Sequence, residues 1–166
     1  LANLNRLQIA QTDQAVYQLL QGLRTTWSDC LFVALAALGD APVNWAVGLA
    51  VLAVLLLKKR KRTAAYWLMT IGGGATVVHL LRFWFKLPRP AMQLSDIAQF
   101  SFPSSHTAIN LILYSFLALL LSRELHSKRL RLDLISGAVA FSLIISFARL
   151  YLGVHWLSDV LGGLAL

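Results

Sequence analysis

The sequence has few of the features that point to a disulfide-bonded, β-sheet or signal-bearing chain. Its single cysteine, Cys30, permits no internal disulfide. No apolar segment alternates strictly between apolar and polar residues, and the chain does not open with a basic segment followed by an apolar signal core. Acidic residues are scarce, 7 against 15 Lys and Arg, so the net charge is +8. The chain is therefore basic, and helix is its expected secondary structure.

Apolar residues make up most of what is present. They account for 58% of the 166 residues and the mean hydropathy is +0.67, whereas about half is usual in soluble domains. They form long runs at 43–57, 63–81, 108–121 and 134–147, and a last run opens at Val154. With flanking residues, these four runs approach the roughly 20 residues of a helical membrane span. We predict an all-α, polytopic membrane helix bundle with four spans and the start of a fifth.

The first 41 residues are expected to lie at the membrane surface. Between residues 12 and 23 the apolar residues fall at helical spacing, as in an interfacial amphipathic helix. The next apolar segment, residues 30–38, has the length of a re-entrant or interface-lying segment. The chain is accordingly divided into interfacial helices, residues 1–41, and a membrane core, residues 42–166, which is expected to belong to a longer polypeptide.

Two clusters of basic residues predict an orientation in the membrane. Residues 58–62 are all Lys or Arg, and four more cations lie within residues 123–131. Because short loops rich in Lys and Arg stay in the cytoplasm, both clusters predict one topology, with Arg82, Arg89 and Arg149 on the periplasmic or extracellular side of a bacterial-type inner membrane. Nucleic acid is not an expected partner, since the clusters adjoin spans and lack an aromatic surface for bases.

Proline shapes the first outer segment. The residue before a proline is disfavoured in a helix, so the second span should end near Lys86 and leave Arg89 on a stiff turn between Pro88 and Pro90. Taken alone, Arg82 and Arg89 are more simply explained as cations at a membrane edge.

A helix start follows at Pro103-Ser104-Ser105-His106. Proline and small hydroxylated residues favour this position, and a helix N-terminus offers free N–H groups to an anion. His106 should project from the first turn of the third span. By itself this signal is weak evidence for catalysis.

The last motif contains Arg149, Gly153, His155 and Asp159. At helical spacing Asp159 can hold one imidazole nitrogen of His155 and leave the other free. A turn at Gly153 would let Arg149 and His155 converge, which one unbroken helix would prevent.

Together these residues have the parts that phosphoryl transfer requires: cations and N–H donors, an in-line nucleophile, and an acid for the leaving oxygen. His155, oriented by Asp159, is the expected nucleophile, and protonated His106 is the expected acid. A zinc site formed by the same three residues is disfavoured, because the nearby arginines would repel a dication.

The three motifs resemble those of the type 2 phosphatidic acid phosphatases, membrane lipid phosphatases related to vanadium haloperoxidases. The resemblance implies a six-helix core, here with the first span preceding Leu1 and the last cut short. It also implies a phosphatase without metal or other cofactor, with the three catalytic roles given above. Arg82, Arg89, Ser104 and Arg149 would hold the phosphate, and we add Ser105.

Three positions depart from the family's usual residues, because Arg82 replaces lysine, Ser105 replaces glycine and Ala148 replaces serine. The predicted substrate is a lipid phosphate or diphosphate, with polyprenyl diphosphate, phosphatidate and phosphatidylglycerophosphate all admissible. An acceptor other than water would make the enzyme a phosphotransferase. An anion-binding transporter or channel, and a catalytically weak lipid-phosphate-binding domain, are the alternative functions.

Overall fold

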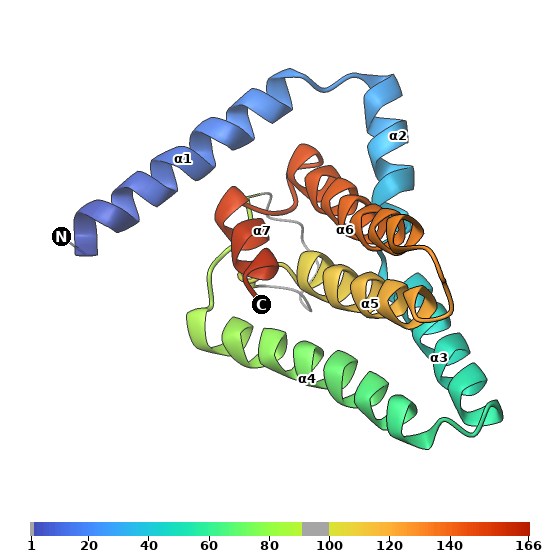
Figure 1. Cartoon of the computed structure of the whole chain (residues 1–166). Coiled ribbons are helices and arrows are strands. Elements are labelled where there is room, and N and C mark those ends of the chain that lie inside the picture. Colours follow the sequence, from blue (N-terminus) through green and yellow to red (C-terminus); the bar gives the residue numbers. More distant parts are fainter. Residues whose placement is uncertain (1, 91–99) are drawn as a thin grey trace.

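The computed structural model describes residues 2–90 and 100–166, with side chains from Arg6 onward. This part of the chain forms seven α-helices and no strand, so the predicted all-α class is confirmed. The helices are α1 (Ala2–Gly22), α2 (Thr26–Ala37), α3 (Ala41–Leu57), α4 (Lys61–Phe85), α5 (Ser105–Ser122), α6 (Lys128–Tyr151) and α7 (Leu157–Leu164). Helices α5 and α6 pack side by side, with α4 against α5 and α2 against α6 (Figure 1).

Within the described residues, four segments are long and apolar enough to cross a membrane: Thr26–Leu57, Lys61–Phe85, Ser105–Ser122 and Lys128–Tyr151. The first includes both α2 and α3, which are separated only by a short turn at Leu38, Gly39 and Asp40. Residues 30–38, expected to be a re-entrant or interfacial segment, therefore belong largely to a helix that leads directly into α3. The integral membrane character of the chain is confirmed.

The predicted helix ends agree with the structure. Helix α4 stops at Phe85, and Lys86 adopts a left-handed conformation with φ of 49°. Gly153 makes the turn after α6 with φ of 71°, which other residues rarely adopt. Helix α7 then begins at Leu157, three residues later than expected from the sequence.

The two basic loops lie at one end of the bundle, because Arg60 in the first forms an ion pair with Glu124 in the second, at 3.0 Å. Near this end α3, α4 and α5 pack around Trp67, Leu55 and Leu113. The predicted site residues lie at the opposite ends of α4, α5 and α6. At that end α1 is tied to α7, because Asp13 accepts hydrogen bonds from the backbone and side chain of Ser158.

Candidate active site

His155 and Asp159 form a fully buried pair at the start of α7. His155 Nδ1 lies 3.2 Å from Asp159 Oδ2, and neither side chain is exposed. The same carboxylate oxygen accepts a hydrogen bond of 2.8 Å from the Trp156 N–H. His155 lies just before the helix and Asp159 in its first turn, so the contact forms across the helix N-terminus. The Trp156 N–H therefore orients the Asp159 carboxylate that contacts the imidazole.

Burial determines the protonation of His155. It holds the pKa of His155 below its usual range, although the hydrogen bond to Asp159 opposes this effect. We therefore expect a neutral imidazole at pH 7, which is the nucleophilic form. If Nδ1 donates its proton to Asp159, Nε2 carries the free lone pair.

The second histidine lies beside the first. His106 occupies the first turn of α5, and its ring centroid is 6.4 Å from that of His155. Ser104 caps this helix, since its hydroxyl accepts from the Thr107 N–H, and its own N–H donates to the Asp159 carbonyl at 2.9 Å. The second and third motifs are thus joined by a direct backbone contact.

Each of the three arginines contacts a different segment of the site. Arg82 donates through Nε to the Pro103 carbonyl at 3.0 Å. Arg89 donates to the Val154 carbonyl at 3.4 Å, and burial lowers the pKa of its guanidinium while the charge of Asp159 raises it. Arg149, at the end of α6, pairs with Asp40.

Several polar atoms at this end of the bundle are buried without a hydrogen-bond partner among the described residues. Of the eight such side-chain atoms in residues 2–90 and 100–166, five belong to predicted site residues. They are Arg82 Nη2, His106 Nδ1, Arg149 Nε, His155 Nε2 and Asp159 Oδ1. Four of these are nitrogens of cationic or imidazole groups, so the arrangement suits an anionic ligand.

Asp40 is a site residue that the sequence analysis did not identify. It lies in the turn between α2 and α3, and its Oδ1 is 3.2 Å from His106 Nε2 and also contacts Arg149 Nη2. In the sequence it appears only as the residue before a helix start, next to Gly39 and Pro42. No local spacing links it to either partner, because both contacts join distant segments.

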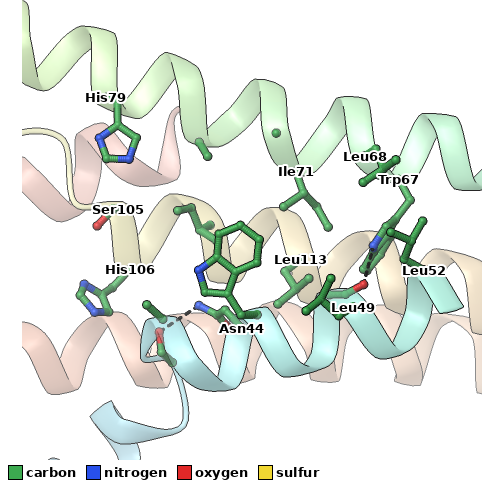
Figure 2. A pocket seen from close by; sticks show the side chains of 17 residues that line it. Asn44, Leu49, Leu52, Trp67, Leu68, Ile71, His79, Ser105, His106 and Leu113 are labelled. Atoms are coloured by element: carbon green, nitrogen blue, oxygen red, sulfur yellow. Dashed lines mark hydrogen bonds between the residues drawn. The ribbon is translucent and has the colours of Figure 1, made fainter.

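An apolar cavity of about 460 Å³ lies between α3, α4 and α5 and reaches Ser105 and His106 (Figure 2). Its walls are mainly hydrocarbon and aromatic, with Trp67 and Leu52 at the end away from His106. His79 of α4 faces the same cavity near Ser105. The cavity therefore joins the polar site to the apolar interior of the bundle.

Fold and geometry together describe a polytopic membrane protein in which two histidines and three arginines lie together at one end of the helix bundle. The model of the PAP2 superfamily matches residues 62–166, and the chain belongs to this family. The resemblance inferred from the three motifs is thereby confirmed, and with it the class of enzyme, a PAP2-type phosphatase of lipid phosphates.

Among individual proteins, the chain is similar to phosphatidylglycerophosphatase B of Bacillus subtilis (strain 168). The two are 25% identical over 164 residues, which cover 95% of this chain and 79% of the relative. The crystal structure of a transmembrane PAP2 type phosphatidylglycerolphosphate phosphatase from Bacillus subtilis has the same fold. Its TM-score is 0.84 at 23% identity, with 95% and 79% of the two chains covered. Aquifex aeolicus LpxE follows with a TM-score of 0.67 at 26% identity, covering 92% and 87%.

Proposed function

We propose that this protein hydrolyses a membrane lipid phosphate or diphosphate through a phosphohistidine intermediate and without a metal ion. The observation that carries the proposal is the 6.4 Å separation of the His106 and His155 rings, with His155 paired to Asp159 and three arginines around them. One imidazole can then attack phosphorus while the other faces the leaving oxygen. The arginines and the N-terminus of α5 supply the charge and N–H donors for the remaining oxygens.

The proposed reaction has two steps. Neutral His155 attacks phosphorus through Nε2, the P–O bond to the lipid breaks, and the departing alkoxide takes a proton from His106. Asp159 stabilises the positive charge that develops on His155. Water then attacks the phosphohistidine, His106 takes a proton from that water, and the N–P bond breaks to return neutral His155.

Phosphatidylglycerophosphate is the first substrate to test, because a similar sequence and a similar crystal structure are both named for that activity. Phosphatidate and a polyprenyl diphosphate belong in the same panel, since the described site residues would contact the phosphate that all of these lipids share. The apolar cavity that reaches His106 supports a substrate with a hydrocarbon chain.

We also propose that the site opens on the external face of the inner membrane. The pair Arg60 and Glu124 holds the two basic loops together at one end, and the site lies at the other end. Positively charged loops favour the cytoplasm, which would leave the site outside. Labelling of single cysteines introduced beside the site and in the basic loops, with a reagent that does not cross membranes, tests this assignment. Labelling of the loop cysteines alone would refute it.

The activity is tested by phosphate release from the substrate panel in detergent with EDTA present. We expect turnover of at least one lipid phosphate, its loss in His155→Ala, and an acid-labile phosphate on the protein when wild type is quenched during turnover. His126→Ala is the matched control, since His126 is exposed in a basic loop. Turnover that requires an added divalent metal, or that persists in His155→Ala, would overturn the proposal.

A further inference from the structure

We propose that Asp40 is a positioning residue for His106, forming a second histidine–carboxylate pair opposite His155 and Asp159. In this arrangement the Asp40 carboxylate accepts the proton on His106 Nε2, so that Nδ1 is the nitrogen that protonates the leaving oxygen. The inference rests on the proposed function, because it assigns a partner to the acid of that reaction.

The side chain of Asp40 is directed to the site instead of to its own helix. Asp40 precedes α3 in the N-cap position, where aspartate usually accepts from the helix backbone, yet its side chain makes no capping hydrogen bond. Its Oδ1 instead meets His106 Nε2 at 3.2 Å and Arg149 Nη2. For this contact to be a hydrogen bond, the ring nitrogen must carry the proton, since a carboxylate can only accept.

Residues of three helices contact the turn that contains Asp40 and hold it in place. The Gly39 carbonyl accepts from Asn44 Nδ2 of α3 at 3.0 Å (Figure 2) and from Asn110 Nδ2 of α5 at 3.2 Å. Gly39 also approaches α6 closely, because an added Cβ would lie 2.5 Å from Ile145 Cγ2 and 2.4 Å from Asn110 Nδ2. Asn110 is fully buried, and its carbonyl accepts from Ser142 of α6. This packing gives the Asp40 backbone a defined place beside His106.

The remaining nitrogen of His106 is not engaged by another described residue and so is available to act as the acid. His106 Nδ1 is buried without a partner among the described residues, as is His155 Nε2 in the neighbouring ring. In the first step the P–O bond breaks, its electron pair stays on the lipid oxygen, and that oxygen takes the Nδ1 proton. His106 becomes neutral and keeps the proton on Nε2, which stays hydrogen-bonded to Asp40. In the second step Nδ1 takes a proton from the attacking water, which restores the starting state.

The effect of an Asp40 substitution on substrates with different leaving groups distinguishes a role in positioning His106 from a purely structural role. An alkyl phosphate needs protonation of its oxygen as the P–O bond breaks, whereas a p-nitrophenolate leaves without it. The test therefore compares kcat/KM for the best lipid phosphate of the panel with kcat/KM for p-nitrophenyl phosphate. The value of kcat/KM reflects only the steps up to formation of the phosphohistidine. If the substitution weakens the binding of phosphate by Arg149, kcat/KM falls equally for both substrates and their ratio does not change.

We expect Asp40→Asn to lower kcat/KM for the alkyl phosphate about 100-fold and that for p-nitrophenyl phosphate less than about threefold, since general acids contribute at least about 100-fold. His106→Ala should show the same selective loss, and Asp40→Glu should restore part of it. Asp29→Asn is the matched control, because Asp29 lies on α2 and pairs with Arg24 away from the histidines.

An equal loss on both substrates would overturn the inference, because it would mean that Asp40 only supports the fold or Arg149. A gain in activity in Asp40→Asn would also overturn it, since Asp40 would then compete with phosphate. If wild type turns over lipid phosphates and His155→Ala does not, either result leaves the proposed function intact. Failure of wild type on the whole panel would instead count against the function itself.

Discussion

The two histidines of the site have carboxylate partners of opposite kinds. His155 and Asp159 are four residues apart, meet across the start of α7, and are both fully buried. His106 and Asp40 come from α5 and from the turn before α3, with side chains 25% and 44% exposed. One pair is therefore built by local backbone geometry, and the other by the packing of distant helices.

The difference matches what each histidine has to do in the proposed reaction. A nucleophile must be neutral and fixed in one tautomer, which a buried carboxylate held by the Trp156 N–H provides. An acid must lose and regain a proton in every cycle, so its carboxylate has only to hold the other ring nitrogen, and Asp40 contacts Arg149 as well. We expect the local pair to be the more sensitive of the two to substitution.

Removal of the nucleophile has the largest expected effect. In His155→Ala no imidazole can attack phosphorus, so kcat should fall by about 10⁵- to 10⁶-fold, as when the nucleophile of a catalytic triad is deleted. Phosphate release and the thermal unfolding midpoint in detergent are the two measurements. A midpoint near that of wild type, with activity lost, assigns the effect to chemistry. Residual activity above about 1% of wild type would contradict the nucleophile assignment.

Neutralising the buried carboxylate ranks second. Asp159→Asn keeps the size of the side chain but cannot stabilise an imidazolium, so kcat should fall by about 10³- to 10⁴-fold. The loss should appear with lipid phosphate and with p-nitrophenyl phosphate alike, because it concerns the attacking group and not the leaving group. A loss of activity with the lipid phosphate alone would mean that Asp159 acts on the leaving group, as proposed for Asp40, and the two histidine–carboxylate pairs would no longer have different roles.

A change in the turn before α3 should affect the second pair alone. Gly39→Ala places a methyl group against Asn110 and Ile145, which should destabilise the protein by about 1–3 kcal/mol. It should also displace Asp40 and lower the ratio of alkyl to aryl phosphate activity several-fold. Denaturant titration and the two-substrate assay measure these effects.

Gly137→Ala is the control for that change, because a Cβ at Gly137 of α6 meets nothing within 4 Å. It should leave both the stability and the substrate ratio close to wild type. Full stability and an unchanged ratio in Gly39→Ala would show that the close approach of the turn to α5 and α6 does not position Asp40.

The same contrast explains how much of the molecule the sequence predicts. The helical class, the helix end near Lys86 and the turn at Gly153 follow from apolar runs, proline and glycine, which act within a few residues. The contact between His155 and Asp159 was expected from helical spacing, but His155 lies before α7, so the contact forms across the start of that helix instead. Asp40 could not be inferred, because its contacts depend on how the turn at Gly39 packs between α5 and α6. The re-entrant or interfacial role expected of residues 30–38 stays a prediction, and the structure adds only that a short turn joins the helix containing most of them to α3.

The titration of His155 gives the smallest and most direct test of the buried pair. Because burial lowers its pKa, His155 should remain neutral below the ordinary histidine value of about 6.5. The unfolded chain then binds a proton that the folded protein does not, so stability falls as the pH drops below that value. Side-chain ¹⁵N spectra of histidine-labelled protein across pH 5 to 8, with His155→Gln to assign the signal, measure the protonation state. A midpoint at or above about 6.5 would mean that the charge of Asp159 outweighs burial, and His155 would then need to lose a proton before it could attack phosphorus.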